Sequence, residues 1–274
     1  MLKKSLLVAA FAGLLFSACK KEEVKNELSE SSQVSSKNNN QAQLTYNLID
    51  DEVSNEIIKI EKDFNGEVKT KLSILACPDI NYTLDNDENP NYVATMTIDF
   101  GTACLKDGIT RKGKIIISKN GKFNATGTVT TVTLENYEVN GFKVEGTLTR
   151  TVKGFTGTWL SGTWEYEVEV EDGKVTGPNN TYFTWESERT VTVSLPSFEV
   201  STTGEAEGVD LFGKAYTVTI TTPLVIKRDC EHIVSGVLEV SPTGVEKRVI
   251  NYGNGTCDKN VTITIGDKVY DVTL

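Results

Sequence analysis

Four cysteines show the clearest spacing pattern among the residues of this chain that could do chemistry. Cys77 and Cys104 are 27 residues apart, and so are Cys230 and Cys257. Ile-Asp-Phe-Gly precedes Cys104 and Ile-Asn-Tyr-Gly precedes Cys257, with a one-residue offset. Four cysteines allow three pairings, and the matched separations favour Cys77–Cys104 and Cys230–Cys257 as parts of a degenerate internal repeat. Zinc binding is the alternative, but CxxC pairs are absent, so we expect no metal.

Histidine and glutamate are the next candidates for catalysis. His232 is the one histidine, and a serine–histidine–aspartate triad would have to use it. The chain has no G-x-S-x-G elbow, so we expect His232 to be structural or exposed. Four glutamates alternate along one strand-like segment, which places them on one face: Glu165, Glu167, Glu169 and Glu171. A glycosidase needs two carboxylates that flank a cleft. We therefore interpret this row as a solvated face and expect no catalytic residue and no cofactor.

An acidic segment at residues 85–91 has the spacing of a loop that could bind a cation. Asp85, Asp87 and Asn89 place oxygen ligands at alternate positions, as calcium loops do. However, Pro90 stands where an EF-hand loop needs glycine, and Met96 stands where it needs glutamate. We interpret the segment as an acidic turn between strands.

Several aromatic residues could either stack on sugars or fill the core of a sheet. They are Trp159, Trp164 and Trp185, with Tyr137, Tyr166 and Tyr182. Large aromatic side chains bury much apolar area, and a core position is the simpler interpretation. Two tryptophans on one exposed face would instead favour a glycan-binding protein.

The first 18 residues have the pattern of a secretory signal. Lys3 and Lys4 precede an uncharged apolar run at residues 5–16, which is shorter than the about 20 residues that span a bilayer. Small residues follow the run and Cys19 comes next, an arrangement that resembles the lipobox of bacterial lipoproteins, although Phe16 departs from the leucine usual there. The resemblance implies that Cys19 is acylated and becomes the N-terminus. Two or more acyl chains anchor a protein stably in a membrane.

The residues after Cys19 are polar and predict a disordered tether over residues 19–43. Serine, asparagine, glutamine, lysine and glutamate dominate this stretch, and such a composition cannot bury a core. Lys21-Glu22-Glu23 resembles the export signal of surface lipoproteins in Bacteroidota. We therefore expect a signal peptide at 1–18, a tether at 19–43 and a single β-rich domain at 44–274, displayed at the cell surface.

The net charge excludes one class of partner. Removal of residues 1–18 takes away two lysines and no acidic residue, so the net charge falls from −10 to −12. Nucleic acids need a basic footprint, so we expect no nucleic-acid partner. The charge also disfavours a domain that lies flat on anionic lipid.

The hydrophobic pattern predicts one short helix followed by many strands. Val53, Ile57 and Ile60 have helical spacing within residues 50–63, and Asp50 or Asp51 could cap the helix. After about residue 67, threonine and valine are frequent and proline is scarce, as in β-strands.

Four dipeptides predict tight antiparallel hairpins: Asn120-Gly121, Asn140-Gly141, Asp172-Gly173 and Gly266-Asp267. No later segment has the length and period of a crossover helix, which argues against a parallel sheet. The expected fold is all-β, an antiparallel meander of long hairpins. Its strands, about a dozen, would form a sandwich or a curled, barrel-like sheet.

Three segments resemble an uncharacterised all-β lipoprotein family of Bacteroidota. They are residues 108–117 with Asp107, residues 136–146 and residues 216–230. The resemblance covers most of the mature domain and implies an envelope location, but no activity. The sequence thus predicts a lipid-anchored outer-membrane protein, not an enzyme, with a structural or binding role. The alternative is a glycan-binding envelope lipoprotein.

Overall fold

The computed structural model is mostly β-sheet with one long helix. It describes residues 30–63, 77–84, 93–122, 125–158, 161–230 and 232–273. The elements in chain order are α1 (Glu30–Asp63), β1 (Asp79–Leu84), β2 (Val93–Asp99), β3 (Cys104–Lys106), β4 (Ile109–Asn120), β5 (Val129–Val139), β6 (Phe142–Thr156), β7 (Thr163–Thr176), β8 (Tyr182–Ser194), β9 (Glu199–Val209), β10 (Ala215–Ile226), β11 (Ile233–Pro242), β12 (Arg248–Asn254), β13 (Asn260–Ile265) and β14 (Lys268–Thr273).

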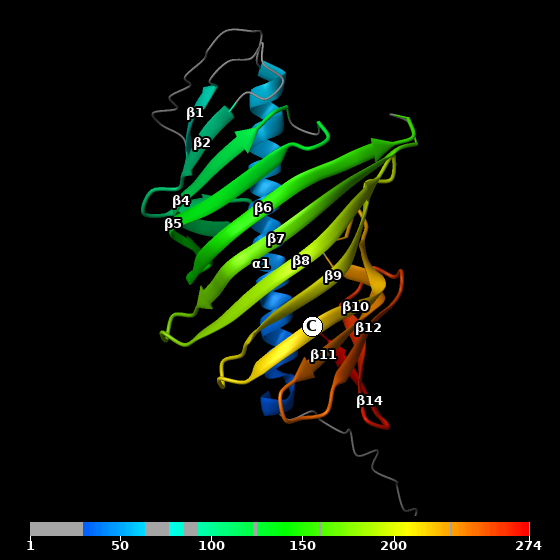
Figure 1. The fold of residues 1–274 in the computed structure, drawn as a ribbon. Coiled ribbons are helices and arrows are strands. Elements are labelled where there is room, and N and C mark those ends of the chain that lie inside the picture. Colours follow the sequence, from blue (N-terminus) through cyan, green and yellow to red (C-terminus); the bar gives the residue numbers. More distant parts are fainter. Residues whose placement is uncertain are drawn as a thin grey trace, which may run out of the picture.

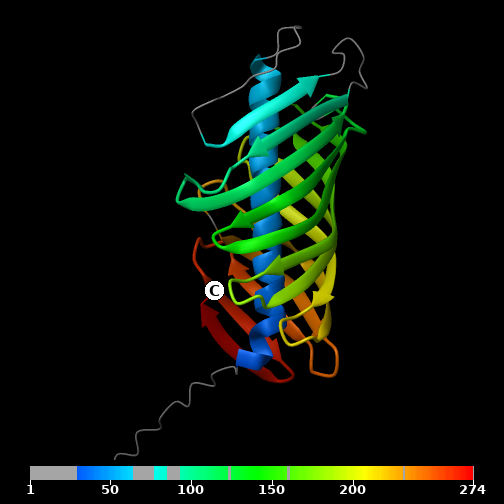
Figure 2. The same ribbon diagram turned by 90° about the vertical axis from the view of Figure 1, so that its left-hand side faces the viewer.

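The strands form one antiparallel sheet in which nearly every strand pairs with its neighbours in sequence. The order is β1-β2-β4 and then consecutive to β14, while the short β3 pairs with β4 beyond the end of β2. The sheet is curled and does not close into a barrel (Figure 2). The predicted all-β meander is confirmed, in the form of a curled single sheet.

Helix α1 lies along the concave face of the curled sheet, which we call the trough (Figures 1 and 2). Its 34 residues span about 50 Å at 1.5 Å per residue. The predicted segment 50–63 is helical, with Val53 and Ile57 buried. The helix begins 20 residues earlier than predicted, at Glu30, so Asp50 and Asp51 are internal and cap nothing.

The expectation of a disordered tether is wrong for residues 30–43. These residues belong to α1, and the folded domain therefore includes residues 30–43 ahead of the predicted start at residue 44. Their polar side chains are buried against the sheet, among them Ser35, Asn38 and Asn39. Composition alone suggested a solvated segment, because it does not reveal that these amides and hydroxyls have hydrogen-bonding partners on the sheet.

Apolar residues of α1 and of the strands form one core inside the trough. Ala42, Tyr46, Ile49, Val53 and Ile57 follow one helical stripe and are all buried. They pack into a cluster with the inward-facing residues of the sheet. On β7 the predicted alternation holds, since Tyr166, Val168 and Val170 are buried and the intervening glutamates are exposed or half-buried. None of the described helices is long and apolar enough to cross a membrane.

Two of the four predicted tight hairpins are present. Asn140 and Gly141 connect β5 to β6, and both have positive φ angles of 49° and 82°, as a type I′ turn requires. Gly266 and Asp267 connect β13 to β14, with Gly266 at φ 55°.

The other two dipeptides have different roles. Asp172-Gly173 lies inside β7, where the register with β8 shifts between Val170 and Gly173. It is a β-bulge, and a Cβ at Gly173 would lie 2.0 Å from the carbonyl oxygen of Trp185 and 2.9 Å from the hydroxyl of Tyr46. Asn120-Gly121 begins a longer connection, because β5 starts only at Val129.

Candidate functional site

Three arginines form a row on the floor of the trough, directly beneath α1. Arg111, Arg150 and Arg189 lie on β4, β6 and β8, and each is separated from the next by 39 residues. All three are buried. From β4 to β8, every second strand therefore contributes one guanidinium to the interface between the helix and the sheet.

Side chains of α1 lie above each arginine of the row. Arg111 Nη2 lies 3.5 Å from Glu52 Oε2, and Arg150 Nη1 lies 3.5 Å from Asp50 Oδ1. Arg150 also donates a hydrogen bond to the hydroxyl of Ser54. Two of the three arginines thus have a carboxylate of the helix as partner, and the charges stabilise the docked helix.

The third arginine, Arg189, has an amide in place of a carboxylate. Its Nη1 donates to Asn47 Oδ1 at 2.8 Å, and its guanidinium stacks 5.1 Å from the ring centroid of Trp185. Burial lowers the pKa of Arg189 to about 10, and only the charge of Asp50 opposes this effect. Arg189 therefore remains a buried cation at neutral pH.

The first half of α1 is held by hydrogen bonds from polar side chains. Ser35 Oγ donates to Asp210 Oδ2 at 2.7 Å, and Asn39 Oδ1 accepts from Trp185 Nε1 at 2.9 Å. Asn38 Oδ1 accepts from the backbone N–H of Leu211 at 3.1 Å. These bonds fix the start of the helix against β8 and the β9–β10 turn.

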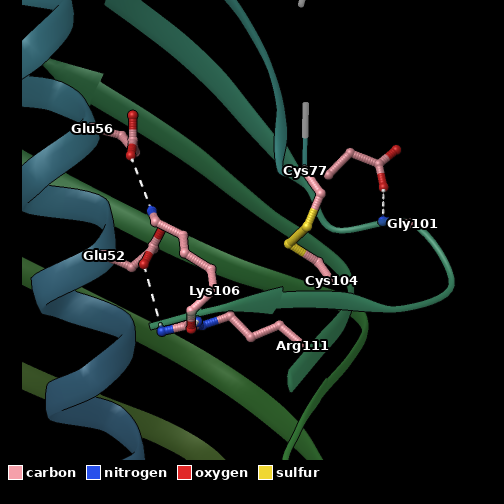
Figure 3. Close-up of a disulfide and its surroundings, with 8 residues drawn as sticks. Glu52, Glu56, Cys77, Gly101, Cys104, Lys106 and Arg111 are labelled. Atoms are coloured by element: carbon pink, nitrogen blue, oxygen red, sulfur yellow. Dashed lines mark hydrogen bonds and ion pairs between the residues drawn. A yellow bond between two sulfur atoms is a disulfide. The ribbon is translucent and has the colours of Figure 1, made fainter. Parts of the chain in front are cut away.

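The two disulfides pair as the spacing predicted, Cys77 with Cys104 and Cys230 with Cys257. The first disulfide joins β3 to the residues that precede β1 (Figure 3). Two residues after Cys104, Lys106 extends to α1 and its Nζ lies 2.8 Å from Glu52 and 3.6 Å from Glu56. Burial alone would lower the pKa of Lys106, but the hydrogen bond and charge of Glu52 and the charge of Glu56 outweigh it and raise that pKa.

Glutamates of β7, β8 and β9 line a groove of about 560 Å³ on the outer, convex face of the sheet. We call it the acidic groove, and its glutamates are Glu169, Glu171, Glu186, Glu188, Glu205 and Glu207. Glu188 directly faces Glu169 on one side and Glu205 on the other. Carboxylate oxygens of Glu167, Glu169 and Glu188 lie within 4.8 Å of one another, a spacing that a divalent cation could use. Glu167 already pairs with Lys153 at 2.8 Å.

His232 lies just before β11, near the second disulfide. It lines a small pocket of about 210 Å³ between α1 and strands β11 to β13. Asn40 and Leu44 form the helical wall of this pocket, and Tyr252 and Asp258 are on the other side. The pocket combines apolar walls with a few polar groups, so it could take a small ligand.

The tryptophans do not form a shared exposed platform in the described part of the chain. Trp185 is 1% exposed and stacks on Tyr46 beneath α1. Trp164 is half-buried between Phe155 and Tyr166. Trp159 lies outside the described residues, as do Cys19, the segment 21–23 and the loop 85–91.

The arginine row is the main structural feature that sequence reasoning missed. The repeat of 39 residues between Arg111, Arg150 and Arg189 was a visible signal, and it equals two strands with their connections. The second missed feature is the polar half of α1. Its asparagines gave no apolar stripe, so the hydrophobic pattern could not reveal it.

Comparison of the chain with protein-family models found no match. The curated proteins and the solved structures gave no significant match either.

Proposed function

We propose that this protein is a lipoprotein of the outer membrane, anchored through Cys19, whose domain is displayed at the cell surface in a structural or binding role. The observation that carries the proposal is the use of the cysteines. Four of the five are joined in two disulfides, and the fifth, Cys19, follows the apolar run and two small residues. That sequence context is the one in which lipoprotein cysteines are acylated.

The disulfides also support export of the domain from the cytoplasm. Disulfides persist in oxidising compartments outside the cytoplasm and are rare in reducing ones. Each disulfide joins cysteines that are 27 residues apart. Both disulfides would remain oxidised in a domain that is exported. The resemblance to Bacteroidota lipoproteins agrees with this location.

The position of α1 supports a role at the outer surfaces of the domain. The trough, where a curled sheet could enclose a ligand, is filled by the helix and its buried polar contacts. A partner would therefore meet the convex face or the two ends of the sheet. We assign no catalytic residue and no cofactor to this protein. A sugar platform on Trp185 is disfavoured because that side chain lies beneath α1.

Metabolic labelling with an alkyne analogue of palmitate tests the anchor. The native chain should take up label and fractionate with membranes. Cys19→Ala should lose the label, because its side chain has no thiol to acylate. Ser17→Ala, which keeps a small residue before the cysteine, is the matched control and should label normally. Label that persists in Cys19→Ala would contradict the proposal.

Protease accessibility in intact cells tests surface display. Alanine at Lys21, Glu22 and Glu23 together should hide the domain from added protease, while acylation is unchanged. Alanine at Lys25, Asn26 and Glu27 alters the same number of residues just beyond the segment and should leave the domain accessible. If added protease digests both variants as readily as the native chain, residues 21–23 are not an export signal. Only the proposal of a lipid anchor then remains.

A further inference from the structure

Three hairpins turn at the end of the sheet where α1 begins: β9–β10, β11–β12 and β13–β14 (Figures 1 and 2). The hydrogen bonds of Ser35 to Asp210 and of Leu211 to Asn38 tie the first of these turns to the start of the helix. We call the turns of these hairpins, with the residues that flank them, the hairpin tips.

The hairpin tips expose apolar side chains. The described residues include ten large hydrophobic side chains that are exposed, and five of them lie at these tips. They are Val209, Leu211, Phe212, Val245 and Val269. Phe212 is 64% exposed and Val269 is 62% exposed. Exposed apolar groups gathered at one end of a molecule mark a surface that meets a partner or a membrane.

Each hairpin tip also carries an exposed lysine, namely Lys214, Lys247 or Lys268. Lys247 pairs with Glu239 at 2.9 Å, and the tips also expose Glu246 and Asp267, so Lys214 and Lys268 are the lysines offered to lipid phosphates. An apolar side chain beside a lysine suits the boundary of a bilayer, where the ammonium can meet lipid phosphates and the apolar group can enter among the acyl chains. The acidic groove lies on the convex face of the sheet, and its negative charge disfavours contact of that face with anionic lipid. The domain is therefore expected to approach the bilayer with its hairpin tips and not with its convex face.

The length of chain before α1 places this end near the anchor. Glu30 follows Cys19 by 11 residues, so covalent geometry keeps the start of the helix within about 40 Å of an acylated Cys19. We propose that the hairpin tips contact the lipid bilayer in which Cys19 is anchored, with Phe212 and Val269 entering the headgroup region. This inference rests on the proposed function, because it requires the lipid anchor.

Fluorescence quenching of the full-length lipoprotein in vesicles of phosphatidylethanolamine and phosphatidylglycerol tests the contact. Phe212→Cys and Val269→Cys each supply one labelling site, because the disulfides occupy four cysteines and acylation occupies Cys19. Phe198→Cys, in the β8–β9 turn at the opposite end of the strands, is the matched control, since Phe198 is 44% exposed. Each thiol carries a polarity-sensitive fluorophore, quenched either by nitroxide on the lipid or by iodide in water.

Labels at 212 and 269 should be quenched by lipid-borne nitroxide and be several-fold less accessible to iodide than the label at 198. Replacing Leu211 and Phe212 by serine should lower the lipid quenching at 269. If the protein floats with the vesicles but neither label is quenched by lipid-borne nitroxide, the proposed tip contact is wrong and the proposed lipid anchor stands. Labels shielded from both quenchers would mean that a protein covers the tips, which also overturns it. Protein that does not float with the vesicles would reject the proposed function itself.

Discussion

Arg189 shows at the scale of one residue how the trough binds its helix. A buried guanidinium is costly unless its donors are satisfied. Here the helix supplies one amide oxygen, from Asn47, and the sheet supplies the face of Trp185. Asn47 is an unremarkable polar residue in the sequence, and only the structure reveals that it accepts a hydrogen bond from a buried cation.

Asn47→Ala should lower the free energy of unfolding by about 2 kcal/mol, because it leaves a buried charged donor without its partner. Urea denaturation monitored by circular dichroism measures the change. Asn55→Ala is the matched control, since Asn55 is an exposed asparagine of the same helix, and it should alter stability by less than about 0.5 kcal/mol. A similar small change for both variants would show that Arg189 does not depend on Asn47.

Glu188 is a residue whose removal should stabilise the protein. It lies directly between Glu169 and Glu205 on neighbouring strands, and like charges in such pairs are destabilising. Glu188→Gln should therefore raise the free energy of unfolding by about 0.5–1 kcal/mol, and the gain should shrink at high salt because salt screens exposed charges.

Thermal melts of Glu188→Gln at low and high ionic strength measure this gain. Glu199→Gln is the control on the adjacent strand, because Glu199 faces Ser194 instead of another carboxylate. A loss of stability in Glu188→Gln would show that the glutamates of the acidic groove do not repel one another.

At the scale of elements, turn chemistry predicted some connections and missed others. Asn140-Gly141 is a hairpin as predicted, whereas Asp172-Gly173 has the same kind of sequence and forms a bulge. The first residue has a positive φ in both dipeptides, 49° at Asn140 and 52° at Asp172, but the glycine has one only at Gly141 and not at Gly173. The difference comes from Tyr46 and Trp185, which pack against the bulge and belong to distant segments, so no local pattern could reveal it.

Helix α1 was also only partly predictable from local sequence patterns. Its second half has an apolar stripe and was predicted, while its first half is bound through serine and asparagine. The disulfide pairs, by contrast, could be predicted from the sequence alone. The two pairs have equal separations, and similar residues precede the second cysteine of each pair.

The two disulfides should stabilise the protein to a similar extent but affect different elements. Each closes a loop of the same sequence separation, 27 residues, so the paired serine variants should each lose roughly 3–4 kcal/mol by the chain-entropy estimate. Loss of Cys77–Cys104 should also release β3 and weaken the contacts of Lys106 with Glu52 and Glu56.

Hydrogen exchange monitored by mass spectrometry distinguishes the two disulfides. Amides of α1 near residues 52–56 should exchange faster in Cys77→Ser/Cys104→Ser. The variant Cys230→Ser/Cys257→Ser is the control and should leave those amides protected. Equal exchange of this segment in both variants would contradict the link from the disulfide through β3 to the helix.

At the scale of the whole molecule, the curled sheet folds around a helix that is polar for half its length. The arginine row, the asparagines of α1 and the apolar stripe all lie in one interface. The helix and the sheet therefore depend on each other for satisfied hydrogen bonds as well as for apolar burial. We expect unfolding to be cooperative, with the helix and the sheet lost together.

The buried tyrosines allow this cooperativity to be tested with pH. Burial raises the pKa of Tyr137 and of Tyr166 to about 12, and it also raises the pKa values of Tyr46, Tyr216 and Tyr252. In an unfolded chain a tyrosine titrates near pH 10. Between these values the unfolded state binds fewer protons than the folded state. Stability should therefore be complete below pH 10 and fall as pH rises from about 10 towards 12.

A pH titration followed by tyrosinate absorbance and by circular dichroism measures the ionisation and the loss of sheet structure together. Tyr182, whose side chain is 53% exposed, supplies the control position. The buried tyrosines should ionise only as the sheet signal disappears. Tyr252→Phe removes one group whose pKa is raised by burial alone and should shift the unfolding midpoint to higher pH. Tyr182→Phe should leave the midpoint unchanged. Ionisation of the buried tyrosines before any loss of sheet signal would contradict a shared, cooperative interface between the helix and the sheet.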